Sequence, residues 1–570
     1  MNSILQLKKA NCKNCYKCIR ECPVKSIKFA DHQANIIKDE CILCGACFVA
    51  CPQNAKQVRN DVPTAKGLIR AAQLAGGKPV VLSLAPSFIA DFAVSGLEDL
   101  QEIFKAMGFS WAEETAVGAQ IVTREYQRMV DQKEQDIIIT TCCHTVNTLI
   151  QRYYPQAIPY MAHTLSPMLA HAKYIKEQHP GAMVVFAGPC LSKKAEAEQY
   201  GYVDCVLTFD ELRDWMEETK AAVPGLELPA PLTPEEQGRR SRSYPISGGI
   251  LKTMKPEDTG YDYIVVDGVR SCMDALREIE EGGLQHCFIE MSACKGSCVG
   301  GPAMHQSHSR TPVANMAKVE RFVGRAPGDF DLPGSETLDL HKDLPFEGIH
   351  TTRPGELQIR QTLIKMGKTL PEHELNCGSC GYNTCREKAI AVCEGKADLS
   401  MCLPFLKERA ESFSDTIISN TPNAILVLDE NLNIQQINKT ACQLFRLGDP
   451  RSVVGTPVVT ILNPAPYMEV MDKNASHRRE ELRHYLAEYD RYVEESVVFD
   501  TDYRVVIIVM KDVTEEEKEA NLRAETRAKT AEITDKVIEK QMRVVQEIAS
   551  LLGETTAETK IALTKLKDVL

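Results

Sequence analysis

Cysteine is the residue whose number and spacing most clearly predict chemistry in this chain. It occurs 22 times in 570 residues, and eight of these cysteines fall between positions 12 and 51. They form two runs with the spacing C-x2-C-x2-C-x3-C-P, namely Cys12, Cys15, Cys18, Cys22 and Cys41, Cys44, Cys47, Cys51. Thiolates at this spacing bind [4Fe–4S] clusters, and the fourth cysteine of each run serves the other cluster. A zinc site needs only four ligands and does not account for two interlocked runs that end in proline.

The spacing therefore predicts two interlocked clusters in residues 1–57. One is held by Cys12, Cys15, Cys18 and Cys51, and the other by Cys41, Cys44, Cys47 and Cys22. This region resembles the bacterial two-cluster ferredoxins, which have a small α+β fold. The resemblance implies transfer of single electrons and a redox partner such as a ferredoxin.

Five further cysteines lie in three segments of the region 58–370 that are far apart in sequence. The segments 140–150 (TTCCHTVNTLI), 188–196 (GPCLSKKAE) and 290–301 (EMSACKGSCVGG) contribute Cys142, Cys143, Cys190, Cys294 and Cys298. Each segment contains or directly follows an apolar, strand-like run, and side chains at the ends of parallel strands commonly form a site. Single buried cysteines are common in protein cores. Two cysteine pairs and a Cys-x2-Lys in one region disfavour that alternative.

In their order and sequence, these three segments resemble the signature motifs of the [FeFe]-hydrogenases. The resemblance implies an H-cluster, in which a [4Fe–4S] subcluster is held by Cys143, Cys190, Cys294 and Cys298. It further implies that Cys298 bridges to a diiron unit carrying CO, cyanide and a dithiolate amine. The reaction implied is the interconversion of two protons and two electrons with H2.

The resemblance also implies which side chains surround the diiron unit. Lys193 falls at the position that donates a hydrogen bond to cyanide, and Cys142 at the position of the thiol that exchanges protons with the amine. A small core residue is the alternative for Cys142. Ala85-Pro86-Ser87 matches the strand that lines the diiron pocket. The implied catalytic residues are thus Cys142, Lys193 and Ser87, and the implied cofactor-binding residues are Pro86, Ser87, Lys193, Gly188 and Ser292.

Several positions depart from the usual motifs. Gly188 and Ser292 stand where methionine is usual, and Lys295 replaces a proline, which should change the dielectric and hydrogen bonding of the pocket. The two glutamates and the serine of the usual proton relay align with Tyr126, Met129 and Ala162, and Glu125 is a candidate substitute. Tyrosine and methionine carry protons poorly near neutral pH. We therefore expect the usual proton path to be interrupted and turnover to be low.

A further cysteine group lies in the region 371–408. Cys377, Cys380, Cys385 and Cys402 have the spacing C-x2-C-G-x3-C-x16-C-x-P, which resembles a small four-cysteine [4Fe–4S] domain. Zinc is the alternative. Cys393 is left over, and we interpret it as a buried thiol on the intervening helix. A cluster here would let electrons leave toward the C-terminus.

The region 409–513 resembles a PAS domain, an α+β module that senses or relays signals. The segments AILVLD, NIQQINKTACQLFRL and YRVVIIVMKDVT carry the resemblance, with a strand-pair turn at Glu430-Asn431-Leu432. Cys442 does not lie in the motif of the flavin photosensors. His477 and His484 lie in a charged stretch that we expect to be helical and solvated. We therefore predict no PAS ligand.

The region 514–570 is charged and has a helical pattern. Apolar residues recur at spacings of three and four, in one stripe through Ile538, Met542, Val545, Ala549 and Leu552 and an adjoining one through Val537, Val544, Ile548 and Leu551. The face is too wide for a two-stranded seam. We expect Gly553 to end the helix, residues 556–570 to fold back, and two copies to form a four-helix bundle. Histidine is absent after His484, so this part is not a histidine kinase.

The elements that must position the central cysteines follow from the pattern of residues 58–370. Apolar runs such as VVLSLAPSF, MVVFAGPC and YIVVDGV alternate with amphipathic stretches such as LEDLQEIFKAMG, which predicts an α/β domain with largely parallel strands. The net charge of −12 argues against nucleic acid as a partner. No uninterrupted run reaches the roughly 18 apolar residues of a membrane span. We expect a cytoplasmic protein.

Three functions fit this domain order. The first is a sensory [FeFe]-hydrogenase that binds or slowly oxidises H2 and signals through its PAS and helical regions, as a homodimer or higher oligomer, to a separate kinase or phosphatase. The second is a metabolic, ferredoxin-linked [FeFe]-hydrogenase. The third is a scaffold with [4Fe–4S] clusters but no diiron unit. Lys193, Ser87 and Cys142 argue against the scaffold, and the interrupted proton path argues against a metabolic enzyme.

Overall fold

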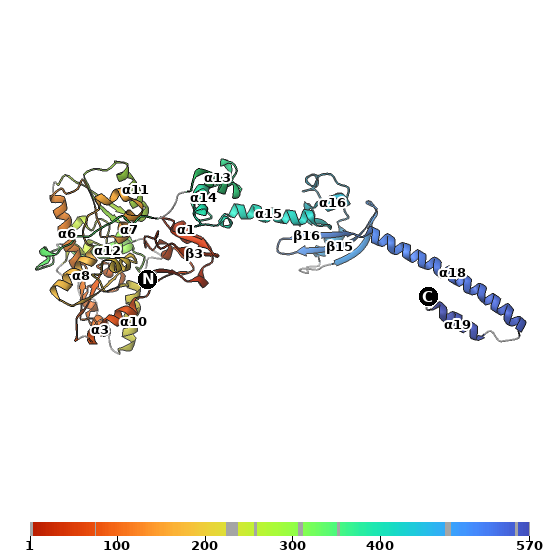
Figure 1. The fold of residues 1–570 in the computed structure, drawn as a ribbon, viewed down its shortest axis with the longest axis horizontal. Helices are drawn as coiled ribbons and strands as arrows, with labels where there is room; N and C mark the ends of the chain where they lie inside the picture. Colours follow the sequence, from red (N-terminus) through yellow and green to blue (C-terminus); the bar gives the residue numbers. More distant parts are fainter. Residues whose placement is uncertain are drawn as a thin grey trace. The chain divides into compact units, whose positions relative to one another are not determined.

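The computed structural model forms two compact units, residues 1–405 and 406–570, and each is described by itself (Figure 1). The structure describes residues 4–74, 76–223, 238–255, 259–305, 312–325, 327–349, 354–472, 480–552 and 557–568. None of the helices in these ranges is long and apolar enough to cross a membrane.

The N-terminal region is built from two small antiparallel strand pairs and two short helices. Strand β1 (Leu5–Leu7) pairs with β4 (Lys56–Val58), and β2 (Ile27–Ala30) pairs with β3 (Gln33–Ile36). Helices α1 (Lys17–Glu21) and α2 (Ala46–Val49) each begin inside a cysteine run and contact one another. A Cβ atom on Gly45, just before α2, would lie 2.5 Å from Pro302. The second cysteine run therefore packs closely against the segment that follows Cys298.

Two parallel sheets form the centre of the first unit, as the alternating pattern predicts. One sheet has the order β6-β5-β8-β9, from strands Trp111–Glu114, Val80–Leu84, Met183–Gly188 and Cys205–Thr208. The other has the order β10-β11-β7, from strands Asp262–Asp267, Cys287–Ser292 and Ile137–Ile139. All residues of β5 are buried. Burial on both faces explains why β5 is almost continuously apolar rather than alternating.

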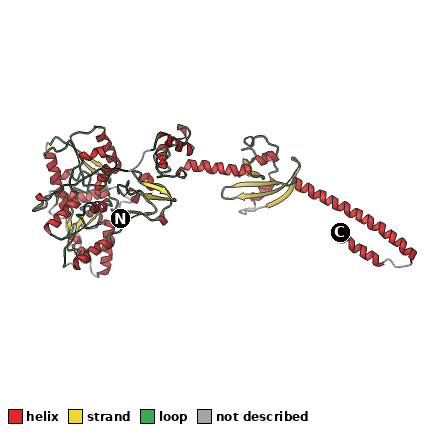
Figure 2. Ribbon diagram, in the orientation of Figure 1, coloured by secondary structure: helices red, strands yellow, loops and turns green. Residues whose placement is uncertain are grey.

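Helices pack around these sheets (Figure 2). The predicted helical stretches form α5 (Gln101–Met107) and α8 (Pro167–Gln178), and α8 packs against α6 (Ala116–Asp131). The remaining helices of this part are α3 (Val62–Leu74), α4 (Phe88–Asp91), α7 (His144–Tyr153), α9 (Ser192–Tyr200), α10 (Phe209–Ala222), α11 (Val269–Glu280) and α12 (Val313–Val323).

The four-cysteine region packs against the ferredoxin-like region. It contains α13 (Glu356–Lys365) and α14 (Cys385–Cys393), which pack together, and it leads into α15 (Leu403–Asn420). Its Tyr382 and Met401 are buried in one hydrophobic cluster with Ile19 and Phe29. The backbone N–H of Phe29 donates to the carbonyl of Lys396 at 2.7 Å. The two cysteine regions thus share a core although about 300 residues separate them.

The second unit contains a five-stranded antiparallel sheet with the order β13-β12-β16-β15-β14. The strands are Ala424–Leu428 (β12), Ile434–Ile437 (β13), Glu480–Leu486 (β14), Arg491–Asp500 (β15) and Val505–Asp512 (β16), with helices α16 (Lys439–Leu444) and α17 (Ala465–Asp472). The pairing of β12 with β13 agrees with the predicted turn at 430–432. The helix expected around His484 is wrong, because His484 lies in β14, paired with Val493. His477 lies outside the described residues.

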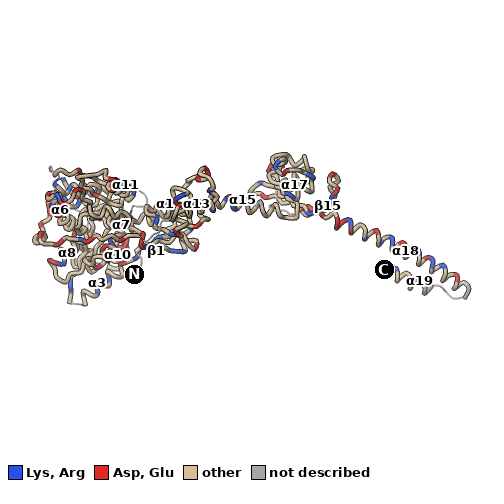
Figure 3. Tube along the Cα trace, turned by 45° about the horizontal axis from the view of Figure 1, so that its top comes forward, with Lys and Arg blue, Asp and Glu red and all other residues tan. Residues whose placement is uncertain are grey.

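The C-terminal region is helical, as predicted. It consists of α18 (Thr514–Leu552) and α19 (Ala557–Lys567), and Lys567 pairs with Asp535 at 2.9 Å. Gly553 and Thr556 lie outside the described residues. Charges of both signs alternate along α18 (Figure 3). Several large apolar side chains of α18 are nevertheless exposed, namely Leu522, Ile533, Val537, Val544 and Ile548.

Candidate functional site

The carboxyl ends of four parallel strands lead into one cavity of the first unit. Pro86 and Ser87 follow β5, Cys142 and Cys143 follow β7, Cys190 follows β8, and Cys294 follows β11. These residues line a cavity of about 120 Å³ together with Lys193, Ser292 and Cys298. The three motif segments, which are up to 150 residues apart in sequence, therefore meet at one place, as expected for the ends of parallel strands.

Ser87 gives a test of whether this cavity suits a bound polar group. Its side chain is fully buried, and its hydroxyl has no hydrogen-bond partner among the described residues. A buried hydroxyl without a partner is costly. The donor set is also appropriate, because four thiolates and an ammonium group surround the same space. The residues present therefore fit the thiolate-bound cluster and diiron unit that the motifs imply.

Lys193 is held at the cavity wall by a buried charge network. Its ammonium group donates to the carbonyl of Cys142 at 3.1 Å and pairs with Glu196, and Glu196 also pairs with the fully buried Lys342 at 2.9 Å. Burial opposes the charge on Lys193, but the Glu196 carboxylate outweighs it, so the pKa of Lys193 is raised. Lys193 therefore stays a cation at the cavity wall.

Cys142 lies beside a fully buried tyrosine. Its Sγ atom is 3.2 Å from the hydroxyl oxygen of Tyr126, which accepts a hydrogen bond from the backbone N–H of Thr141 at 2.9 Å. Burial raises the pKa of the Cys142 thiol to about 12, although Tyr126 and Lys193 act in the opposite direction. The thiol is therefore protonated near neutral pH and faces the cavity.

The positions aligned with the usual proton relay belong to the hydrophobic core. Tyr126, Met129 and Ala162 are buried in the main core cluster. Glu125 does not replace the missing carboxylates, because it forms an ion pair with Arg128 at 2.6 Å on the outer side of α6. Among the described residues, no carboxylate therefore stands where the relay glutamates are expected.

Phe186 provides an apolar side chain close to Gly188, where the sequence indicated the loss of a methionine. A Cβ atom on Gly188 would lie 2.8 Å from the ring of Phe186, and Phe186 itself lines the cavity. The position thus accepts only glycine without movement of that ring. Ser292 lines the cavity, whereas Gly188 and the exposed Lys295 are not among its lining residues.

Two ionisable residues of the cavity were not identified from the sequence. Glu290 accepts hydrogen bonds from the backbone N–H groups of Gly248 at 2.9 Å and Ile250 at 3.0 Å, and burial raises its pKa to about 7. Tyr244 also lines the cavity, and its hydroxyl is 2.7 Å from that of Thr123. Glu290 is the first residue of the third motif segment, so its position in the sequence could have identified it as a cavity residue. Tyr244 lies in no motif.

Each of the two ferredoxin-like cysteine runs has a member close to cysteines of the other run. Burial raises the pKa of Cys18 to about 11, and the thiolates that add to this effect are those of Cys12, Cys15 and Cys51. For Cys47, the corresponding neighbours are Cys44, Cys22 and Cys41. The pKa of Cys294 is raised mainly by burial, and Cys44 is close enough to contribute to this increase. The second set is therefore adjacent to the cavity cysteines.

The cysteines of the region 371–408 separate into one group and one outlier. Cys377, Cys380, Cys385 and Cys402 line a common pocket. The expectation that Cys393 is buried is wrong, because its side chain is exposed at the end of α14, where its Sγ atom lies 3.2 Å from the hydroxyl of Thr362.

Cysteine groups can also bind a single metal ion such as zinc. In the part of the chain that the structure describes, no three His, Cys, Asp or Glu side chains are placed to hold one metal ion. In a [4Fe–4S] cluster, each thiolate binds its own iron atom, so the sulfur atoms stand farther apart than around one ion. The assignment of each cysteine to a cluster remains a proposal.

Four family models match consecutive parts of the chain. Residues 4–61 match a 4Fe-4S dicluster domain, and residues 78–302 match the iron only hydrogenase large subunit, C-terminal domain. Residues 371–404 match an Fe-S cluster model, and residues 412–479 match a PAS domain.

Individual proteins are similar at low identity. The cytosolic iron-sulfur assembly component 3 of Pongo abelii is 23% identical over 387 residues, which cover 54% of this chain and 80% of that protein. The nuclear prelamin A recognition factor of Mus musculus is 20% identical over 53% of this chain and 79% of its own length. The apo [FeFe]-hydrogenase HydA1 structure from Chlamydomonas reinhardtii matches 51% of this chain and 100% of its own, with a TM-score of 0.40 and 16% identity.

The family models thus agree with the cysteine spacings and with the strand ends that form the cavity. Residues 78–302 of this chain are similar to the iron-only hydrogenase large subunit, C-terminal domain, and this match lies between matches to a 4Fe-4S dicluster domain and to a PAS domain.

Proposed function

We propose that the protein is a sensory [FeFe]-hydrogenase of low turnover, which responds to H2 or to redox state and signals through its PAS and helical regions. The observation that carries the proposal is one cavity lined by Cys143, Cys190, Cys294 and Cys298 together with Cys142, Lys193 and Ser87, whose hydroxyl has no hydrogen-bond partner among the described residues. A cluster scaffold alone would leave the last three without a role.

The proposed H-cluster is held by these four cysteines. When bound, its diiron unit supplies the redox chemistry that interconverts H2 with two protons and two electrons. The cationic Lys193 and the hydroxyl of Ser87 bind and orient the anionic ligands, because charge-assisted hydrogen bonds are strong in a low dielectric. The Cys142 thiol holds a proton at the cavity wall, next to the hydroxyl of Tyr126.

The electrons are proposed to leave through the remaining clusters. The set that includes Cys44 is adjacent to Cys294, and the other ferredoxin set and the pocket of Cys377, Cys380, Cys385 and Cys402 complete a path of [4Fe–4S] clusters. A ferredoxin is the proposed external redox partner. We propose the boundaries 1–57, 58–370, 371–408, 409–513 and 514–570 for the functional regions.

The interrupted relay and the attached regions favour a sensor over a metabolic enzyme. A positioned acid–base group contributes about 10² to 10⁴ in rate. Loss of the relay groups at Tyr126, Met129 and Ala162 therefore lowers proton transfer without removing the cavity in which H2 would bind. A slow enzyme is poorly suited to metabolic flux but adequate for signalling, here to a separate kinase or phosphatase.

A scaffold without a diiron unit is the alternative that the similarity to the cytosolic iron-sulfur assembly component 3 favours. Infrared spectroscopy of the protein after maturation separates the two functions. The sensor proposal expects CO and cyanide stretching bands, because these ligands belong to the diiron unit. A fully matured sample that contains the [4Fe–4S] clusters and shows neither band would support the scaffold instead.

The exposed apolar stripe of α18 leads to a prediction on oligomeric state. Val537 and Val544 are seven residues apart and about half exposed, so they lie on one face of the helix. We expect the full chain to be at least a homodimer and a chain ending at Val513 to be a monomer that keeps its iron. Light scattering and iron analysis measure both properties.

A pair of full-length variants tests the same surface. Changing Val537 and Val544 together to Asp should dissociate the dimer, because charges would replace the buried contact. Ser550→Asp, at an exposed position on the opposite side of the same helix, is the matched control and should leave the dimer intact. An unchanged oligomeric state after both truncation and double substitution would exclude α18 as the interface.

A further inference from the structure

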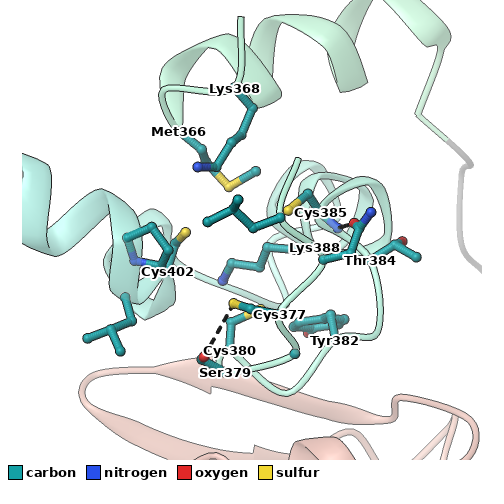
Figure 4. Close-up of a pocket in the computed structure, with 15 residues that line it drawn as sticks. Met366, Lys368, Cys377, Ser379, Cys380, Tyr382, Thr384, Cys385, Lys388 and Cys402 are labelled. Carbon is teal, nitrogen blue, oxygen red and sulfur yellow. Dashed lines mark hydrogen bonds between the residues drawn. The ribbon is translucent and has the colours of Figure 1, made fainter. Parts of the chain in front are cut away.

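Two buried lysines lie in the pocket of the four-cysteine region. Lys368 and Lys388 line this pocket together with the four cysteines, and Lys388 lies one helical turn after Cys385 on α14 (Figure 4). Lys388 is 1% exposed and Lys368 is 6% exposed. Lysine is among the residues least often buried unless it is paired, so both positions require an explanation.

Neither lysine forms an ion pair with a carboxylate in the described ranges of the chain. The ammonium group of Lys388 donates to the carbonyl of Asp398 at 2.5 Å and lies 5.6 Å from the ring centre of Tyr382. By contrast, the buried Lys194 of the central domain pairs with Asp61 at 2.7 Å and with Glu211 at 2.9 Å. The carboxylate of Asp398 attracts Lys388 without forming an ion pair, but it is exposed and accepts a hydrogen bond from the backbone N–H of Ser400 at 2.7 Å. A buried cation with so little compensation is unfavourable. An anion inside the pocket would therefore stabilise both lysines.

A [4Fe–4S] cluster bound by four thiolates is such an anion, and its one-electron reduction adds a further negative charge. A nearby cation favours the more negative state, and the effect is large in a low dielectric. The reduction potential of such clusters depends on the charges and hydrogen bonds around the sulfur atoms. Among the described residues of the ferredoxin-like region, Lys56 is the one buried lysine, and it is available to two proposed clusters.

We propose that Lys388, supported by Lys368, raises the reduction potential of the cluster held by Cys377, Cys380, Cys385 and Cys402, so that this cluster collects electrons. In the step concerned, a ferredoxin-region cluster loses one electron, this cluster gains it, and no proton is transferred. The inference rests on the proposed function only in that this pocket holds a [4Fe–4S] cluster.

The proposed cluster lies next in sequence to the segment that leads to the PAS domain. Cys402 is followed directly by α15 (Leu403–Asn420), and three residues separate α15 from β12, the first strand of the PAS domain. The cluster ligand is thus the last proposed metal ligand before the signalling region. A change of charge at this cluster occurs at the start of the connecting helix.

A redox titration of the full-length protein followed by electron paramagnetic resonance tests the inference. The protein is produced with its [4Fe–4S] clusters but without diiron maturation, and the signal of this cluster is identified as the one that Cys380→Ser removes. In Lys388→Met, which keeps a similar side-chain length, we expect at least a tenfold lower ratio of reduced to oxidised cluster at a given potential. For a one-electron couple, this corresponds to about 59 mV toward more negative potential.

The controls separate charge from packing. Lys388→Arg keeps the charge and should stay close to the wild type, and Lys365→Met removes an exposed lysine of α13 and should shift no signal. If Lys388→Met does not retain the cluster, Lys368→Met must show the negative shift. A wild-type protein without a signal that Cys380→Ser removes would overturn the inference, and so would an unshifted signal in the lysine variants that retain it.

The infrared test of the diiron unit is independent of this titration. A shifted potential without CO and cyanide bands would keep the inference and reject the proposed hydrogenase function. CO and cyanide bands together with an unshifted reduction potential would support the hydrogenase function and reject the inference about Lys388.

Discussion

Replacing Lys193 by Met is expected to abolish loading of the diiron unit and with it the CO and cyanide infrared bands. The substitution removes the one ammonium group that lines the cavity in the described structure, and a methionine side chain cannot donate to an anionic ligand. Charge-assisted hydrogen bonds in a low dielectric are among the strongest polar contacts in proteins. The [4Fe–4S] signals should persist, because the cysteines are unchanged.

Lys194 provides the matched control for this prediction. It is the next residue in the chain and is also buried, but it pairs with Asp61 and Glu211 and does not line the cavity. Breaking a buried ion pair by removing one partner costs about 3–5 kcal/mol. Glu196 retains Lys342 when Lys193 is lost, so Lys194→Met should destabilise the protein at least as much.

The two variants separate a direct role of Lys193 from general destabilisation. We expect infrared bands in Lys194→Met and none in Lys193→Met when both are compared at equal cluster content. Full-intensity bands at unchanged frequencies in Lys193→Met would show that this lysine does not contact the diiron ligands.

Replacing Cys142 by Ala is expected to lower H2 turnover by about 10² to 10⁴, the usual contribution of a positioned acid–base group. The thiol is the proton-bearing side chain between the cavity and the hydroxyl of Tyr126. Alanine fills most of the same space, and Tyr126 keeps its hydrogen bond from Thr141. The infrared bands should therefore remain while the rate falls, as measured by H2 evolution with a reduced dye.

Cys205→Ala controls for the loss of a buried thiol as such. Cys205 is buried in the main core, and its Sγ atom is 3.7 Å from the carbonyl of Asp61, away from the cavity. Its substitution should leave turnover within a small factor of the wild type. Rapid wild-type turnover that Cys142→Ala does not change would refute both the thiol's role and the interruption of the proton path.

A relay glutamate cannot be introduced at position 126 without a structural cost. Glutamate at position 126 would place a carboxylate in the space of a fully buried tyrosine that packs against Phe288. It would also remove the hydroxyl that accepts from the backbone N–H of Thr141. An unpaired buried donor costs about 1–3 kcal/mol. Sequence alignment treated this position as a missing relay group, whereas the fold uses it as core.

The sequence alone determined the features that depend on short-range spacing. The cysteine runs, the three motif segments and the apolar runs of the strands are local patterns, because ligand spacing and strand burial act over a few residues. They were sufficient to predict the parallel strands around the cavity and to select Ser87, Cys142 and Lys193, which line it. The two crossed ferredoxin sets stay a prediction.

Tertiary structure alone decided which distant side chains complete these sites. Lys342 neutralises Glu196 from 146 residues away, Phe186 fills the space beside Gly188, and Tyr244 reaches the cavity from outside every motif. His484 was assigned to a helix because its neighbours are charged, but pairing with β15 placed it in a strand. The physical reason is common to all these cases: burial, charge pairing and strand pairing depend on which elements become neighbours, and local sequence does not specify that.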